Sequence, residues 1–419
     1  MKSSFTFVKA FNRLSLIDKI LPLAILLAIV AGILISVYVS SSRNAFDGAQ
    51  VVGVSIPLAV GLIIMMIPPL CKVQWENLHI FFAKKEFIKP ILISLIINWI
   101  LCPFLMFGIA WLTLFDNDEY RTGIIMIGMA RCIAMVLIWN EIAGGDNTLC
   151  AIIVIVNSLL QIVLYAPYQL FFCYVITGNY QHQTDLSYSI VAKSVAFFLG
   201  VPFGIGLLIR LIGFFTLGIE KYNKKIIPFI SPWALIGLLY TIIIIFIEKG
   251  NDFIQDIGSG FRCFIPLVVY FLITWFGTFF ILRKLLGKTP RQKLQGENEG
   301  EDDNDDDDET QLLCGCEKEL EKSTTSMWAV QNCSASYKQI VTLAFTAASN
   351  NFELSLAVAI SVYGNGSKEA IAATFGPLVE VPILLLLCFV AKYFQMKLLW
   401  SDVEYDDDNN NIDEIQLSH

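Results

Sequence analysis

Long apolar stretches alternate with short polar segments along most of the chain. Each apolar stretch holds about 20 residues or more, which is the length that an α-helix needs to cross the hydrocarbon core of a bilayer. The pattern predicts ten membrane-spanning helices, at residues 20–39, 51–70, 90–114, 123–142, 148–176, 190–213, 226–247, 264–282, 340–363 and 369–393. We therefore expect an all-α polytopic membrane protein that resides in a lipid bilayer.

Composition supports this fold class, because 56% of the residues are hydrophobic and only 16% are charged. The sequence contains no Walker loop, no glycine-rich nucleotide fingerprint and no HExxH motif. We therefore predict a protein that is not an enzyme, has no cofactor and does not bind nucleic acid. Any work across the membrane would therefore draw its energy from an ion gradient or from a partner ATPase. The sequence makes no prediction of oligomeric state.

The distribution of lysine and arginine predicts the orientation in the membrane. If the N-terminus is cytoplasmic, the cytoplasmic segments and adjoining span ends carry 22 of the 29 Lys and Arg residues, against five on the other side. Positive residues gather on the cytoplasmic side of membrane proteins, so both termini are predicted to be cytoplasmic. The resulting parts are an N-terminus (1–19), a first five-helix unit (20–176), an extracytoplasmic loop (177–189), a second five-helix unit (190–395) with a cytoplasmic insertion (283–339), and a tail (396–419).

The insertion between the eighth and ninth spans is strongly acidic. Ten of the thirteen residues from 297 to 309 are Asp or Glu, and the tail is acidic as well. Such runs repel themselves and cannot bury apolar surface, so both segments are predicted to be disordered. The insertion is either a solvated linker or a regulatory tether. Its Cys314-Gly-Cys316 motif is either incidental or a binding site for a soft metal ion.

The two halves share a spacing of polar residues and glycines. Aligning Gly145 with Gly364 places Cys132 opposite Asn351 and Gln161 opposite Glu380. Two units of five spans each would be inverted relative to one another in the membrane. Inverted repeats with interrupted helices at the midplane are typical of secondary transporters. We therefore predict that the fourth and ninth spans are interrupted, near residues 131–132 and 349–351.

Arg131 and Cys132 lie near the middle of the fourth span. An ion at this depth is costly unless it faces a cavity or a partner, so it suggests a functional site. Cys132 adds a soft sulfur ligand. Alternatively, the arginine is structural and hydrogen-bonds exposed carbonyl groups, and the cysteine only packs.

Glu353 and Glu380 are the only acidic residues well inside any predicted span, and no histidine lies in a span. A desolvated carboxyl group can bind and release protons near neutral pH. These residues are therefore the candidate proton carriers, with Glu380 as the first choice. The alternative is a structural ion pair between Arg131 and one of the two carboxylates.

Three segments carry a resemblance to a known family. They are Arg131-Cys-Ile-Ala-Met-Val-Leu-Ile-Trp-Asn-Glu-Ile-Ala-Gly-Gly-Asp146, Ala347-Ala-Ser-Asn-Asn-Phe-Glu-Leu354 and Gly376-Pro-Leu-Val-Glu-Val-Pro382. They resemble the arsenical-resistance protein 3 family of arsenite efflux permeases, and within it the fungal plasma-membrane members. This family belongs to the bile acid/arsenite/riboflavin transporter superfamily. The resemblance implies ten helices in two inverted repeats, a panel bundle, and a core bundle with two crossing interrupted helices.

The resemblance also implies a function and a set of site residues. The family exports arsenite, and antimonite in fungal members, usually in exchange for protons. Its functional residues correspond here to Arg131, Cys132, Asn157, Asn351, Phe352, Glu353 and Glu380. Trivalent arsenic and antimony bind thiols, which fits Cys132. Arsenite is mostly an uncharged trihydroxide at neutral pH, so it needs hydrogen-bond partners such as Asn157, Asn350 and Asn351.

Two other functions remain open. One is a sodium-coupled organic-anion symporter of the same fold, in which Asn350, Asn351 and Glu353 hold sodium and Arg131 binds a carboxylate. The other is a transporter-like receptor that signals through the acidic insertion and the tail.

Overall fold

The structure is a computed structural model, and it describes residues 16–39, 50–73, 87–133, 135–177, 188–255, 257–286, 335–364, 367–398 and 400–402. This part of the chain is almost entirely helical. Most of the acidic insertion, Cys314 and Cys316 included, lies outside the described residues, as do the first 15 residues and most of the tail.

The elements of the first half are α2 (Leu16–Tyr38), β1 (Gln50–Val51), β2 (Val54–Ser55), α3 (Ile56–Lys72), α5 (Ile88–Ile96), η4 (Ile97–Leu101), α6 (Cys102–Thr113), α7 (Asp118–Met129), α8 (Met135–Ala143), α9 (Asn147–Leu170) and η5 (Phe171–Val175). The elements of the second half are α10 (Tyr188–Val195), η7 (Ala196–Gly200), α11 (Val201–Leu217), α12 (Ile219–Lys221), η8 (Tyr222–Ile226), α13 (Ile227–Gln255), α14 (Ile257–Arg262), α15 (Phe264–Leu286), α19 (Tyr337–Ala348), α20 (Phe352–Tyr363) and α21 (Lys368–Lys397). The elements labelled η are short π-helical turns that continue their neighbouring α-helices.

Six helices of the described residues are long and apolar enough to cross a membrane. They are Ile88–Thr113, Asn147–Val175, Val191–Leu217, Ile219–Ile247, Gly260–Leu286 and Lys368–Lys397. Shorter apolar helices occupy Leu23–Tyr38, Ile56–Lys72 and Phe352–Tyr363. A polytopic helical membrane protein is therefore confirmed.

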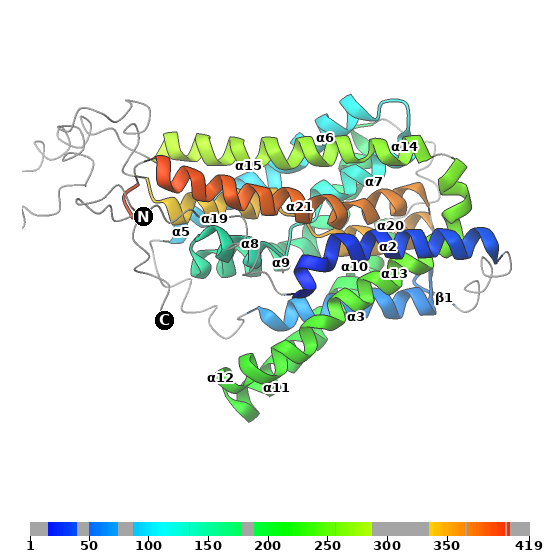
Figure 1. The fold of residues 1–419 in the computed structure, drawn as a ribbon, viewed down its shortest axis with the longest axis horizontal. Helices are drawn as coiled ribbons and strands as arrows, with labels where there is room; N and C mark the ends of the chain where they lie inside the picture. Colours follow the sequence, from blue (N-terminus) through cyan, green and yellow to red (C-terminus); the bar gives the residue numbers. More distant parts are fainter. Residues whose placement is uncertain are drawn as a thin grey trace, which may run out of the picture.

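The helices form two groups (Figure 1). The first bundle consists of α2, α3, α11 and α13, in which α13 packs along both α2 and α3. Glycines allow this close approach, since a side chain on Gly237 of α13 would collide with the backbone of α3 at Gly61 and Met65. Small residues of this kind bring membrane helices together. The second bundle contains α6, α7, α15, α19, α20 and α21.

Two helices of the second bundle are interrupted where polar residues enter the apolar sequence. The first stops at Met129 and resumes at Met135, and the second stops at Ala348 and resumes at Phe352. The two extended segments lie antiparallel, with the N–H of Cys132 donating to the carbonyl of Ser349 (3.4 Å) and the N–H of Asn351 donating to that of Ala130 (3.1 Å). These bonds satisfy backbone groups that would otherwise be exposed at membrane depth.

Both resumed half-helices end at a glycine in the left-handed region. Gly144 has a φ of 77° and Gly364 a φ of 95°, conformations that glycine adopts without steric cost. The chain then turns into α9 and α21, whose first turns are capped by the side chains of Asp146 and Ser367. The turns therefore lie at Gly364 and next to Gly145, the two glycines that the alignment of the two halves pairs.

The far end of α20 is tied to the turn that precedes α3. The hydroxyl of Ser361 donates to the carbonyl of Val52 (2.5 Å) and also lies 2.6 Å from the hydroxyl of Ser194. Val52 has a φ of 53°, a left-handed conformation that costs a β-branched residue about 1–2 kcal/mol. Such strain persists only where the surroundings hold it. The turn is thus a hydrogen-bonded contact between the two bundles.

Candidate substrate-binding site

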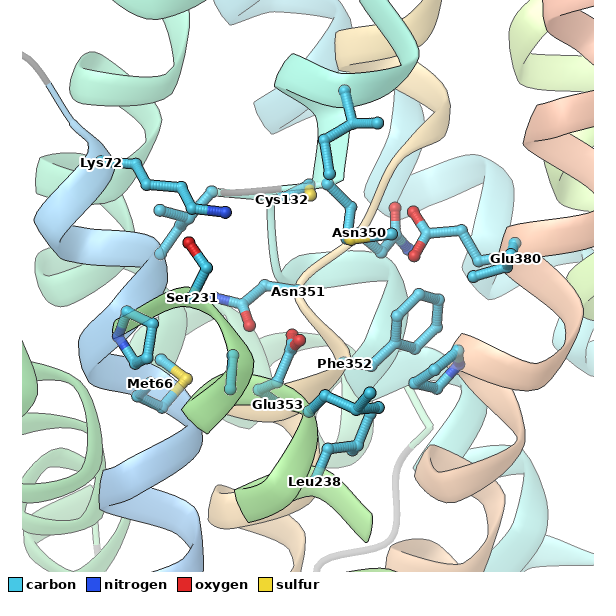
Figure 2. Close-up of a pocket in the computed structure, with 18 residues that line it drawn as sticks. Met66, Lys72, Cys132, Ser231, Leu238, Asn350, Asn351, Phe352, Glu353 and Glu380 are labelled. Carbon is cyan, nitrogen blue, oxygen red and sulfur yellow. The ribbon is translucent and has the colours of Figure 1, made fainter. Parts of the chain in front are cut away.

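A cavity of about 110 Å³ lies between the two bundles, next to the crossing of the interrupted helices. It has room for several water molecules or for one small solute. The first bundle contributes Met66, Pro68 and Lys72 from α3 and Ser231, Ala234, Leu235 and Leu238 from α13. The second bundle and the interrupted segments contribute Cys132, Ile133, Met135, Ile138, Asn350, Asn351, Phe352, Glu353, Pro377, Glu380 and Val381. Figure 2 shows the polar members of both walls converging on this space.

Cys132 and Asn351 occupy matching positions at the starts of the two resumed half-helices. The thiol of Cys132 accepts a hydrogen bond from the N–H of Val136 (3.4 Å), and Oδ1 of Asn351 accepts one from the N–H of Leu354 (3.0 Å). The N-terminus of a helix carries partial positive charge. Two such ends beside one cavity favour a ligand whose outer atoms are oxygens.

Glu380 and Glu353 reach the cavity from α21 and α20. Glu380 is only 3% exposed, and its Oε1 accepts a hydrogen bond from the hydroxyl of Ser349 (2.5 Å). Glu353 lies in the first turn of α20, where the partial positive charge of the helix end favours a carboxylate. The structure therefore brings both candidate proton carriers to the same cavity as Cys132.

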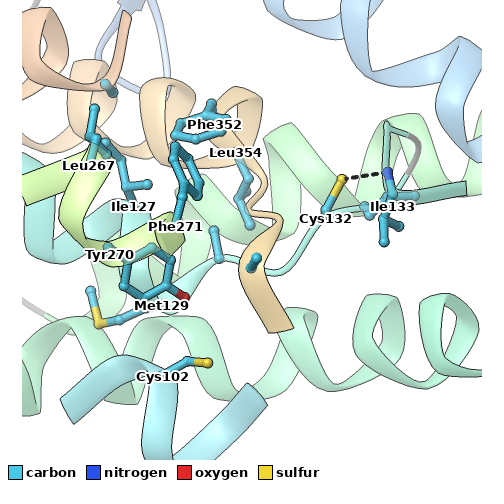
Figure 3. Close-up of a cluster of buried hydrophobic side chains, with 14 of the residues drawn as sticks. Cys102, Ile127, Met129, Cys132, Ile133, Leu267, Tyr270, Phe271, Phe352 and Leu354 are labelled. Atoms are coloured by element: carbon cyan, nitrogen blue, oxygen red, sulfur yellow. Dashed lines mark hydrogen bonds between the residues drawn. The ribbon is translucent and has the colours of Figure 1, made fainter. Parts of the chain in front are cut away.

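Arg131 is fully buried and does not line this cavity. Its guanidinium donates to the hydroxyl of Tyr270 (3.3 Å), to the carbonyl of Ala347 (3.4 Å) and to the carbonyl of Gly128. Figure 3 shows Tyr270 on the α15 side of this crossing, among buried apolar side chains. No ion pair joins Arg131 to Glu353 or Glu380 in the described part of the chain. That hypothesis is therefore corrected, because carbonyl groups at the end of each half-helix hold the guanidinium instead.

Each interruption is hydrogen-bonded to a polar side chain of another helix, Gln161 at the first and Glu380 at the second. Oε1 of Gln161, on α9, accepts a hydrogen bond from the backbone N–H of Arg131 (2.5 Å). Under the register that aligns Cys132 with Asn351, Gln161 corresponds to Glu380, which binds at the other interruption through Ser349. Each interruption is thus held by one polar side chain from the long helix that follows it.

Asn157 is buried away from the cavity, at the contact between α9 and η4. Its Oδ1 accepts a hydrogen bond from Nε1 of Trp99 (3.0 Å). The structure therefore brings together six of the eight predicted site residues, namely Cys132, Asn350, Asn351, Phe352, Glu353 and Glu380. Arg131 and Asn157 lie behind them.

Phe352 closes one side of the cavity and is almost fully buried. It packs against Phe271 with ring centroids 6.4 Å apart. On α21, a side chain at Gly376 would overlap the Phe352 ring. The glycine therefore makes the space in which this ring lies.

Sequence reasoning missed the wall that the first bundle supplies. In the sequence, Lys72 is one of many predicted cytoplasmic positive residues, and Met66 and Ser231 lie inconspicuously within apolar spans. No motif marks them, because they belong to the site only through the packing of α3 and α13 against the second bundle. The one available signal was that Lys72 directly continues an apolar helix.

A cavity between two helix bundles, at the meeting point of two interrupted helices, indicates a membrane transporter, and the arrangement is typical of secondary transporters. In agreement, residues 59–256 match the sequence model of the Sodium Bile acid symporter family. The chain is also 36% identical to arsenical-resistance protein Acr3 of Corynebacterium glutamicum over 93% of its own length and 92% of that protein. It therefore belongs to the Acr3 arsenical-resistance family, and this membership makes it a transporter rather than an enzyme.

Two more distant relatives also match most of the chain. Arsenical-resistance protein Acr3 of Alkaliphilus metalliredigens is 25% identical over 86% of this chain and 87% of that protein. An uncharacterized transporter of Synechocystis is 26% identical over 92% of this chain and 91% of that protein. The similarity thus extends over nearly the whole chain.

Proposed function

We propose that this protein exports arsenite, and also antimonite, from the cytoplasm in exchange for protons. The observation that carries the proposal is the position of Cys132, a thiol on the wall of a small cavity at the start of a half-helix. Trivalent arsenic and antimony are soft acceptors that bind sulfur, which supports these substrates. The arsenical-resistance names of two relatives support the same class of substrate.

The other groups on the cavity suit an uncharged trihydroxide. Asn350 and Asn351 offer amide groups, and the two half-helix ends offer partial positive charge to hydroxyl oxygens. Cys132 is the one thiol on this cavity among the described residues. A single thiol binds the metalloid weakly enough for release, whereas three would hold it as a chelate.

Proton coupling is assigned to Glu380, with Glu353 shaping the site. Both carboxyl groups face the cavity that holds the substrate, so their protonation and substrate binding can influence each other (Figure 2). Sodium coupling is the second candidate, because the matching family model is that of sodium symporters. In that case Asn350, Asn351 and Glu353 would hold the sodium ion.

The proposal includes ten spans in two inverted repeats, with both termini cytoplasmic and the protein in the plasma membrane. It is supported by the symmetry of the crossing, since the bonds from Cys132 to Ser349 and from Asn351 to Ala130 exchange under the proposed register. The repeats would comprise residues 20–176 and 190–395. The cavity between the bundles would alternately open to the two sides as one bundle moves against the other.

Everted plasma-membrane vesicles test the function directly. We expect uptake of arsenite that accelerates when a pH gradient is imposed and that disappears in Cys132→Ser. Acceleration by a sodium gradient alone would replace proton coupling with the second candidate. Absence of arsenite and antimonite flux in vesicles with correctly inserted protein would overturn the proposed substrate.

A further inference from the structure

A second cavity adjoins the substrate cavity and shares one residue with it. This cavity has a volume of about 170 Å³. Its walls are Lys72 and Val73 at the end of α3 and residues of α8 and α9, among them Glu141 and Asn147. Lys72 lines both cavities. Its side chain therefore lies where the two cavities meet.

The exposure of the lining residues decreases from the second cavity to the substrate cavity. Glu141 and Asn147 are exposed, Lys72 is half-buried, and Cys132 and Glu380 are only 7% and 3% exposed. The second cavity thus has exposed residues in its wall, whereas the residues at the centre of the substrate cavity are buried. Figure 2 shows the ammonium end of Lys72 directed into the substrate cavity, on the same side as Cys132.

Both walls of the second cavity are held in place. The carbonyl of Cys71 accepts hydrogen bonds from Arg210 and from Tyr222, both at 3.1 Å, which fixes the backbone that carries Lys72. On the opposite wall, Oδ1 of Asn147 accepts a hydrogen bond from the amide of Asn140 (2.9 Å). Hydrogen bonds therefore hold the helix ends on both sides of the second cavity.

We propose that the second cavity is the cytoplasmic vestibule of the transporter and that Lys72 is the selectivity residue at the passage to the substrate cavity. This inference rests on the proposed function and deepens it. An ammonium group can donate hydrogen bonds to the hydroxyl groups of an uncharged solute. It also repels cations, and the low-dielectric walls of a cleft strengthen this field. Lys72 thereby admits polyhydroxylated neutral or anionic solutes and keeps metal cations from Glu353 and Glu380.

The test measures access to Cys132 with thiol reagents of opposite charge, and it requires no transport. Full-length protein in everted vesicles is treated with an anionic and with a cationic methanethiosulfonate of similar size, each without substrate. Modification of Cys132 is scored as labelling that is absent in Cys132→Ser. We expect Lys72→Glu to lower the ratio of anionic to cationic labelling rates roughly tenfold or more. The reason is that the substitution changes the charge of one side chain beside the substrate cavity by two units.

Matched variants separate charge in the passage from charge elsewhere. Lys72→Met should give an intermediate ratio and Lys72→Arg the wild-type ratio. Lys224→Glu is the control, since Lys224 is exposed and pairs with Glu220 (2.7 Å) away from both cavities. It should leave the ratio unchanged. Glu141→Gln removes the opposite charge at an exposed position and should raise the ratio, which keeps the proposal testable if substitutions of Lys72 prevent folding.

The outcomes distinguish this proposal from the proposed function. A ratio that is the same in wild type, Lys72→Glu and Glu141→Gln would overturn the role of Lys72, whatever substrate is carried. A charge-dependent ratio in vesicles that transport neither arsenite nor antimonite would leave the vestibule in place and overturn the substrate. A ratio that shifts equally in Lys224→Glu would assign the effect to surface charge and overturn the selectivity role.

Discussion

The hydroxyl of Ser349 donates a hydrogen bond to Oε1 of Glu380 at 2.5 Å. This bond joins the second interruption to α21, the helix that contains the proposed proton carrier. Glu380→Gln keeps the shape of the side chain but cannot titrate. We expect this variant to lose acceleration of arsenite uptake by a pH gradient while still exchanging arsenite down its own gradient. Vesicle flux with and without a pH gradient measures both. Full acceleration in Glu380→Gln would move the proton carrier elsewhere, with Glu353 as the first candidate.

Cys132→Ser is predicted to abolish arsenite export without affecting insertion, because serine keeps the size of the side chain and loses the soft ligand. We expect a decrease in flux of at least about tenfold, which corresponds to roughly 1.4 kcal/mol of lost transition-state stabilisation. Cys150→Ser and Cys173→Ser are the controls, since both thiols are buried outside the cavity. If Cys132→Ala exports arsenite as well as wild type does, the thiol only packs.

Gly376→Ala is predicted to displace the ring of Phe352, because the added methyl group would overlap it. Overpacking of this kind costs about 1–3 kcal/mol. The thermal unfolding temperature should fall and the affinity for arsenite should decrease. Gly277→Ala on α15 is the matched control, since nothing lies within 4 Å of the added atom. Equal effects of the two substitutions would contradict the role of Gly376.

Ser361→Ala is predicted to loosen the contact between α20 and the turn before α3. It removes the donor to the carbonyl of Val52, a bond worth about 0.5–1.5 kcal/mol. The fraction of molecules whose substrate cavity is open to the extracytoplasmic side should rise several-fold. This fraction is measured as labelling of Cys132 by an impermeant thiol reagent added from outside. Ser158→Ala, which removes only a bond within α9, is the control. Unchanged labelling in Ser361→Ala would show that this contact does not hold the far side closed.

The orientation predicts that residues 185 and 305 face opposite sides of the membrane. Cysteines introduced at Asp185 and Asp305, both outside the described residues, should react with impermeant reagents from outside and from the cytoplasm, respectively. Reaction of both from the same side would refute the proposed topology.

Much of the architecture follows from local sequence signals. Apolar length predicts the helices, and three consecutive polar residues at Ser349, Asn350 and Asn351 predict an interruption, because a membrane helix tolerates them only where they find partners. The structure ends α19 at Ala348 and begins α20 at Phe352. Glycines at 144 and 364 mark the turns because they alone adopt the required φ without cost.

The partners of buried polar groups could not be predicted in the same way. A charge in a span indicates a partner without naming it, and Arg131 proved to bind Tyr270 and main-chain carbonyls rather than a carboxylate. Asn157 likewise pairs with Trp99 of another helix. The proposed role of Lys72 depends on which face of α3 meets the second bundle. The apolar composition of this helix does not indicate which face that is.

The backbone bonds at the crossing determine which parts of the site can move. Separating Cys132 from Ser349 would leave two main-chain groups without their partners at membrane depth, so the four half-helices are expected to behave as one rigid block. The metalloid would then stay bound to this block while α3 and α13 move relative to it. Substitutions in the block should therefore change the affinity for the metalloid. Substitutions on the faces of α3 and α13 that meet the block should change the rate of transport.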